Sequence, residues 1–206
     1  PSLDTQIREL EDSTDRYEDR LGTYLLTLAR RPMTANDSDE SGRLLHLISD
    51  FERIADHAVN ILDSAEELHA KKITLPEDAR QELSTMERAV QEIIDLSLQA
   101  FQTGNLEIAS RVEPLEQVID TLKDQLRTRQ IQRLQTGVCS LETGFIWTDL
   151  LTNFEHVADH CSNIAGCILE TQHKSLDLHE YLDGVKTGAP EFRRDYEAYS
   201  RKYALV

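Results

Sequence analysis

An internal repeat constrains the fold of this chain more than any other feature of its sequence. The segment 48–61, ISDFERIADHAVNI, returns at 151–164 as LTNFEHVADHCSNI. Seven residues recur at identical spacing, and the offset from Glu52 to Glu155 is 103 residues. A shorter similarity precedes each copy, with LEDSTD at 10–15 and LEQVID at 115–120. Self-similarity at a fixed offset predicts two copies of one structural unit.

The spacing of apolar residues predicts helices throughout the chain. Apolar side chains recur at three- and four-residue intervals, no stretch alternates for long with period two, and there are only 8 glycines and 5 prolines. We therefore expect an all-α fold. The expected helices cover 3–29, a span from a cap at Asp39 or Ser41 to about Ala70, 76–103, 106–134 with Pro114 starting or kinking its regular part, 140–173, and 191–203.

The two repeats differ in their number of expected helices. The helix 76–103 opens the second repeat, whereas its counterpart in the first would lie before residue 1. We therefore divide the chain into a first repeat of two helices at 1–75, a second repeat of three helices at 76–176, and a helical tail at 177–206. The missing helix is expected upstream in a longer polypeptide, or else the first repeat has lost it.

Charge and composition exclude several classes of protein. The formal net charge is −16, which argues against nucleic acid and anionic membrane surfaces as partners. No apolar run reaches the length of a membrane-spanning helix, and no signal peptide is visible. The cysteines are Cys139, Cys161 and Cys167; their odd number and the lack of a CxxC motif indicate a reducing compartment. Cys161 and Cys167 are expected to be packed thiols.

Pairs of carboxylates four residues apart are the candidate functional groups. Residues i and i+4 share one helix face, and here that face borders the buried side. Like charges at this spacing repel, so two such stripes on facing helices favour a bound cation. The predicted metal ligands are Glu11, Asp15, Glu52 and Asp56 in the first repeat, and Glu116, Asp120, Glu155 and Asp159 in the second.

Two other interpretations of these residues stay open. The acidic stripes could form a solvated face, which is the ordinary role of any single such pair. Glu66 with His69, and Glu170 with His173, match the E-x-x-H pattern of di-iron oxidases, although they lie near helix ends and out of repeat register. His57 and His160 lie off the acidic stripe and are expected to hydrogen-bond a neighbouring helix or carboxylate.

The doubled motif F-E-[RH]-[IV]-A-D-H-x-x-N-I, with its upstream L-E-x-x-x-D, closely resembles the PhoU family over 3–172. The form at 48–57 and the tail segments around 179–203 look most like the PhoU-like domain at the C-terminus of bacterial Na+/phosphate cotransporters. The resemblance implies two helical bundles related by a pseudo-twofold axis. One departure is the absent first helix, and another is Arg8, which stands where the second repeat has Glu113.

The resemblance also implies a function. PhoU-like proteins are regulators of phosphate uptake and not enzymes, and their E-x-x-x-D positions hold multinuclear metal clusters. All eight ligand positions keep Glu or Asp here. The implied metal is iron or zinc, with manganese and magnesium as further candidates. The implied partner is a transmembrane phosphate-transporter segment of the same polypeptide, which places the domain on the cytoplasmic side of the inner membrane.

Alternative functions follow from the same residues. A free-standing PhoU-type adaptor of a phosphate transport system would have no membrane segment upstream. A di-iron oxidase would consume oxygen through the E-x-x-H pairs. A purely structural bundle would bind no metal. The open face left by the missing helix invites a homodimer, or filling by the upstream segment.

Overall fold

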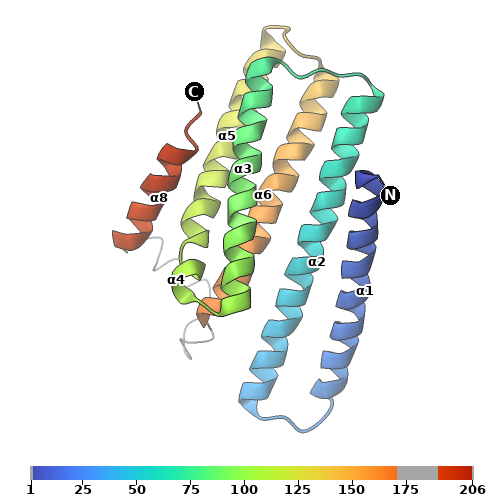
Figure 1. The fold of residues 1–206 in the computed structure, drawn as a ribbon, viewed down its shortest axis with the longest axis vertical. Coiled ribbons are helices and arrows are strands. Elements are labelled where there is room, and N and C mark those ends of the chain that lie inside the picture. The colour runs from blue at the N-terminus through green and yellow to red at the C-terminus, as the bar shows by residue number, and fades with distance from the viewer. Residues whose placement is uncertain (1, 171–189, 206) are drawn as a thin grey trace.

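The computed structural model describes residues 2–170 and 190–205, and every regular element within them is a helix. Four long antiparallel helices and a fifth at the edge form the body (Figure 1). The predicted all-α class is confirmed. The elements are α1 Leu3–Ala29, α2 Ala35–Ala70, α3 Glu77–Thr103, α4 Leu106–Ala109, α5 Val112–Gln135, α6 Leu141–Glu170 and α8 Pro190–Lys202.

The second repeat contains the main hydrophobic core. Helices α3, α5 and α6 pack against one another around fully buried side chains that include Met86, Ile93, Leu115 and Trp147. Helix α8 lies beside α5 and reaches α3 through Tyr203, whose hydroxyl contacts Glu92. The three-helix bundle expected of this repeat is therefore present.

Helix α2 joins the two repeats by packing antiparallel along α6. His57 Nδ1 lies 2.8 Å from Asn153 Oδ1, and His160 Nδ1 lies 2.9 Å from Asp50 Oδ1. At the repeat offset, His57 corresponds to His160 and Asp50 to Asn153. Reciprocal contacts of this kind are the signature of a twofold axis. The rings of His57 and His160 stack with centroids 5.7 Å apart, which places the predicted pseudo-twofold axis between them.

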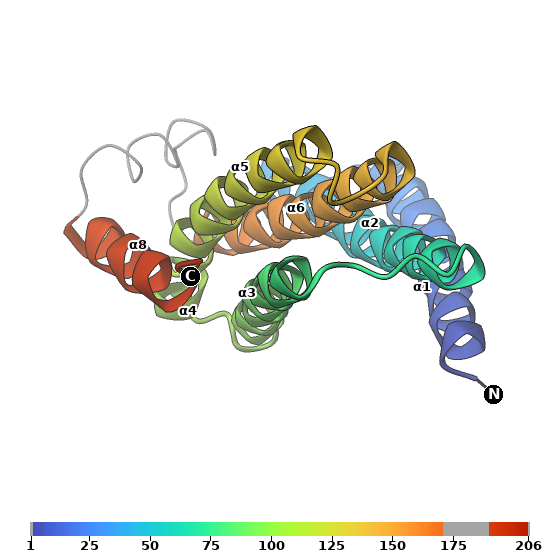
Figure 2. The same cartoon turned by 90° about the horizontal axis from the view of Figure 1, so that it is seen from above.

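Helix α1 is the outermost element, and among the described helices it packs only on α2 (Figure 2). Arg8 of α1 forms ion pairs with two residues of α2, Asp63 at 2.6 Å and Glu66 at 3.0 Å. Leu25 is the only buried side chain of α1. Within the described residues the first repeat thus has two helices, as expected. The exposed large apolar side chains of α1 are Leu3, Leu10, Tyr17, Leu21, Tyr24 and Leu26.

The predicted start of the second helix at Asp39 or Ser41 is wrong. The helix α2 begins at Ala35, because Thr34 and Asp37 form a capping box: the Thr34 hydroxyl accepts from the Asp37 backbone N–H, and the Asp37 carboxylate accepts from the Thr34 backbone N–H. The polar run that looks like a loop therefore forms the first turns of α2. A T-x-x-D signature marked this start in the sequence.

The single helix predicted over 106–134 is in fact two helices, α4 and α5, separated at Ser110 and Arg111. The break places Pro114 in the first turn of α5, where its missing N–H costs no hydrogen bond. Gly104 caps α3 with φ of 63°, and Gly137 follows α5 with φ of 71°, a left-handed conformation that favours glycine.

Some sequence predictions fall outside the described residues, namely the end of the fifth helix at His173 and tail residues 177–189. Cys161 and Cys167 are buried as expected, and burial raises the pKa of their thiols to about 12 and about 11. Among the described helices, none combines the length and apolar character needed to cross a membrane.

The reciprocal contacts yield a prediction about Asp50. Replacing the buried Asp50 by Ala removes the hydrogen-bond partner of the His160 imidazole. This should lower the free energy of unfolding by about 1–3 kcal/mol. Asp50→Asn copies the Asn153 of the other repeat, keeps an acceptor for the imidazole, and should cost clearly less. Urea unfolding of both variants checks this, and equal losses would show that the hydrogen bond does not stabilise the α2–α6 contact.

Candidate metal centre

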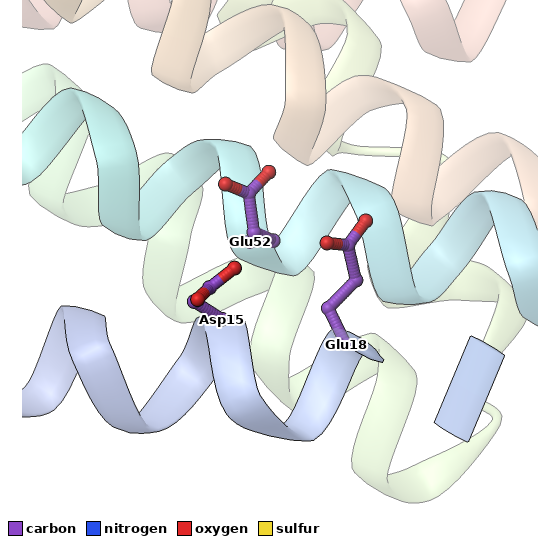
Figure 3. A group of neighbouring side chains, drawn as sticks. All are labelled: Asp15, Glu18 and Glu52. Atoms are coloured by element: carbon purple, nitrogen blue, oxygen red, sulfur yellow. The ribbon is translucent and has the colours of Figure 1, made fainter. Parts of the chain in front are cut away.

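Three carboxylates converge between α1 and α2. Asp15 and Glu18 project from α1 and Glu52 from α2, and one oxygen of each lies within 4.8 Å of the others (Figure 3). Asp15, four residues after Glu11, lies on the side of α1 that faces α2. Helix α2 carries Glu52 opposite it, on the face of α2 that borders the buried side of that helix. Two predicted ligands, Asp15 and Glu52, are therefore brought together with a third acid.

Burial and like charges both disfavour the ionised form of Glu52 in this cluster. Burial raises the pKa of the Glu52 carboxyl above its ordinary value. The negative charges of Asp56, Glu18 and Asp15 raise it further, and Arg53 opposes them. Repulsion of this kind is the condition that a bound cation relieves.

The other two predicted ligands of the first repeat border the cluster. Burial raises the pKa of Glu11, and the charges of Asp12, Asp56 and Asp15 add to the shift. Asp56 is half exposed, and its nearest cation is Arg53, at 3.8 Å. Since the charge of Asp56 on α2 raises the pKa of Glu11 on α1, all four predicted residues share one acidic region.

Glu18 is the ligand candidate that the sequence analysis missed. The E-x-x-x-D pattern contains only pairs four residues apart, whereas Glu18 follows Asp15 by three residues and Glu11 by seven. Both spacings keep side chains on one helix face. The intervals of three and seven residues are therefore the sequence signal that points to Glu18.

The second repeat balances its acids in a different way. At the offset of 105 residues, Lys123 stands where the first repeat has Glu18. The Lys123 ammonium lies 2.9 Å from Glu155 Oε1, and both side chains are mostly buried. The other oxygen, Glu155 Oε2, is buried and has no hydrogen-bond partner among the described residues. A fixed cation thus occupies part of the space that a metal would need.

The remaining predicted ligands of the second repeat are Glu116, Asp120 and Asp159. Burial and the negative charge of Glu155 raise the pKa of Asp159, and the neighbouring Glu116 opposes this shift. Asp120 is exposed. Within the described residues, no group of three possible ligands in the second repeat meets the 4.8 Å spacing of Asp15, Glu18 and Glu52.

The histidines behave largely as predicted. His57 and His160 form hydrogen bonds across the α2–α6 contact. Glu66, from the first E-x-x-H pair, binds Arg8, and His69 is exposed. The described geometry therefore lends no support to an oxidase site at Glu66 and His69.

The donor set of the first repeat fits a divalent cation. Carboxylate oxygens from two helices suit hard and borderline metals. Among the described residues, the one Lys or Arg that forms an ion pair with these three acids is Arg53, 3.6 Å from Glu52. In the second repeat Lys123 reduces the need for a metal, and Glu155 Oε2, which accepts no hydrogen bond, lies 3.6 Å from His156 Nε2. The metal itself stays a prediction.

Comparisons with known proteins agree with this architecture. The model of the PhoU domain matches residues 3–65 and 83–168, once over each repeat. The chain belongs to the PhoU domain family. The shorter first match covers α1 and α2 alone, which agrees with the two-helix form of the first repeat.

Individual PhoU proteins resemble the chain over most of its length. The chain is 25% identical over 146 residues to "Phosphate-specific transport system accessory protein PhoU homolog 1" of Thermotoga maritima. The match covers 71% of this chain and 62% of that relative. The crystal structure of PhoU from Pseudomonas aeruginosa superposes with a TM-score of 0.76 at 21% identity, covering 84% of this chain and 82% of that one. The latter likeness supports the PhoU fold.

The different charge balance of the two repeats predicts opposite effects of neutralisation. In metal-free buffer, Glu52→Gln removes repulsion and should raise the free energy of unfolding by up to about 1 kcal/mol. Lys123→Gln leaves Glu155 without its cation and should lower it by about 1–2 kcal/mol. Chemical unfolding of both variants measures the effects. A loss of stability in Glu52→Gln would contradict the repulsion described above.

Proposed function

We propose that this chain regulates phosphate transport as a PhoU-type protein and does not catalyse a reaction. The observation that carries the proposal is the PhoU domain match over both repeats. The Thermotoga relative is named as an accessory protein of phosphate-specific transport, which supports the same role. The match covers only 62% of that relative, so contact with a transporter is proposed for this chain and is not taken over from the relative.

Two molecular settings fit this role, and they differ in whether the chain belongs to the transporter polypeptide or is separate from it. The resemblance of segment 48–57 favours a domain attached to a sodium-dependent phosphate transporter. The accessory-protein relative favours a free-standing adaptor, and this setting fits the comparisons at least as well. In both settings the helical surface acts by contacting a membrane transporter.

We further propose that a divalent cation controls the packing of α1. Asp15, Glu18 and Glu52 would hold it, and the ion would supply positive charge that neutralises these three acids. Because the described part of α1 packs only on α2, the strength of this contact decides how firmly α1 is held. An ion that binds the packed arrangement better shifts the population towards it.

A metal titration tests this linkage. Adding Mn²⁺ or Zn²⁺ to chelator-treated protein should raise the unfolding temperature and slow hydrogen exchange along α1. A hundredfold excess over Kd corresponds to about 2.7 kcal/mol of stabilisation. Glu18→Gln should lose most of the effect. Glu9→Gln, an exposed acid on the same helix, serves as the matched control and should keep it.

The linkage is wrong if neither metal changes the stability or the exchange of α1, or if Glu9→Gln and Glu18→Gln weaken the response equally. In the second case the response reflects the acidity of the whole helix and not a site at Asp15, Glu18 and Glu52.

Phosphate uptake in the source cells tests the regulatory role. Removing the coding region for this chain should change the rate of uptake of radiolabelled phosphate, and its response to phosphate starvation, with transporter abundance unchanged. An immunoblot for the chain then separates the two settings: a free-standing adaptor gives a polypeptide without a membrane segment, and a transporter domain gives a larger membrane protein. Unchanged uptake in both conditions would contradict the proposed function.

A further inference from the structure

An exposed apolar stripe runs along α1, the outermost helix (Figure 2). Leu10, Tyr17 and Leu21 follow one another at intervals of seven and four residues, which places them on one side of the helix. Their exposed fractions are 69%, 65% and 45%. Nothing in the proposed function uses these side chains.

Leu44 of α2 adds to this surface. A Cβ on Gly22 of α1 would lie 4.0 Å from Leu45 Cδ2 of α2, so the neighbouring Leu21 and Leu44 lie at the same level of the helix pair. Leu44 is 40% exposed. We call the four exposed side chains together the α1 face: Leu10, Tyr17, Leu21 and Leu44.

The second repeat shows what covers the equivalent surface. At the repeat offsets of 105 residues for α1 and 103 for α2, the counterparts of the α1 face are at most 3% exposed. They lie in the core that forms where α3 packs on α5 and α6. A single helix thus covers this surface in the second repeat, and none of the described helices covers it in the first. The counterparts are Leu115, Leu122, Leu126 and Trp147.

Residue exchanges between the repeats indicate how a covering helix must differ from α3. In the second repeat, Arg129 and Arg133 of α5 both form ion pairs with the buried Glu82 of α3. The counterparts of these arginines on α1 are Tyr24 and Leu28. An acid at the Glu82 position would therefore be buried against apolar side chains without a cation, which costs free energy. A helix that fits the first repeat carries an apolar residue at that position.

Charge also separates the two surfaces. Helix α5 contains four acidic and four basic residues, whereas α1 contains seven acidic and three basic residues. Helix α3 contains six acidic and two basic residues, so a helix with its charges would be repelled by α1. The α1 face therefore favours a helix with a net positive charge.

We propose that the α1 face binds one amphipathic helix of a partner protein, a helix with net positive charge and with no acid opposite Tyr24 and Leu28. This helix lies along α1 and α2 as α3 lies along α5 and α6. A second copy of the chain is a poor occupant, because two chains with a net charge of −16 repel each other. The proposal rests on the fold, and it adds to the proposed function a surface for contact with a partner.

A synthetic helix supplies the probe. The α3 sequence, 77–103, already carries an apolar stripe, and four substitutions in the peptide give it the required charge: Asp78→Lys, Glu82→Leu, Glu87→Lys and Asp95→Lys. A hydrocarbon staple on its outward side holds this basic peptide helical, which circular dichroism checks. Fluorescence anisotropy of the labelled peptide with the full chain should show one saturable site, with a Kd on the order of 10 μM.

Two further stapled peptides separate the effect of charge from that of the apolar stripe. The unaltered α3 sequence keeps the stripe with a net negative charge, and it should bind about tenfold more weakly or worse. The basic peptide with Met86→Gln and Ile93→Gln keeps the positive charge. It should also bind about tenfold more weakly or worse, because both of these side chains are buried where α3 packs on its own repeat.

Paired substitutions in the chain locate the site. Tyr17→Gln/Leu21→Gln should weaken binding of the basic peptide about tenfold or more, since it removes two apolar contacts. Leu141→Gln/Phe145→Gln changes an equally spaced pair on α6 that is 73% and 72% exposed. This matched control should change binding less than about twofold. All four side chains are exposed, so both variants should keep the unfolding temperature of the wild-type chain.

Three results would overturn the proposal: no binding of the basic peptide, equal binding of either control peptide, or equal weakening by the two paired substitutions in the chain. A fourth is a dimer of the unliganded chain, seen by light scattering, that Tyr17→Gln/Leu21→Gln dissociates, since a second copy would then occupy the α1 face. The proposed function survives each of these results if removal of the chain still alters phosphate uptake. Conversely, the helix site stands even if uptake proves independent of the chain.

Discussion

The antiparallel contact between α2 and α6 supports everything else in this structure. It joins a three-helix repeat that has its own core to a two-helix repeat that lacks one. His57 and His160 stack at its centre, and each contacts the polar residue equivalent to the other's partner. Because α2 packs on α6 as well as on α1, this contact leaves Glu52 of α2 beside Asp15 and Glu18 of α1.

The two copies of the acidic motif balance their negative charges in different ways. Both copies place Glu and Asp beside the buried face, where repulsion is costly. The second copy carries Lys123, whose ammonium neutralises Glu155 within the chain. The first copy has Glu18 at that position, so three carboxylates converge without a lysine. A single exchange of charge sign thus separates a repeat in which a lysine pairs with Glu155 from one in which Glu18 adds a further negative charge.

Much of the fold could be predicted from the sequence. Helix periodicity is a local signal, and the repeat is recognised by comparing the sequence with itself. The second helix start was missed although the Thr34–Asp37 capping box was visible, since the polar composition after it suggested a loop. The break before Pro114 depends on how α4 turns into α5. For the site, spacing could place Asp15 and Glu52 on facing helices. It could not show that Glu18 meets them, because that depends on the rotation of α1 against α2.

Elemental analysis of protein purified without chelators tests the central claim most directly, the claim that the carboxylates between α1 and α2 form a cation site. The wild-type chain should carry iron, zinc or manganese in stoichiometric amount, and a Glu18→Gln/Glu52→Gln variant should lose it while a Glu116→Gln/Asp120→Asn variant keeps most of it. Metal-free wild-type protein that also fails to take up added metal would contradict the claim. The acids of the first repeat would then be a solvated face.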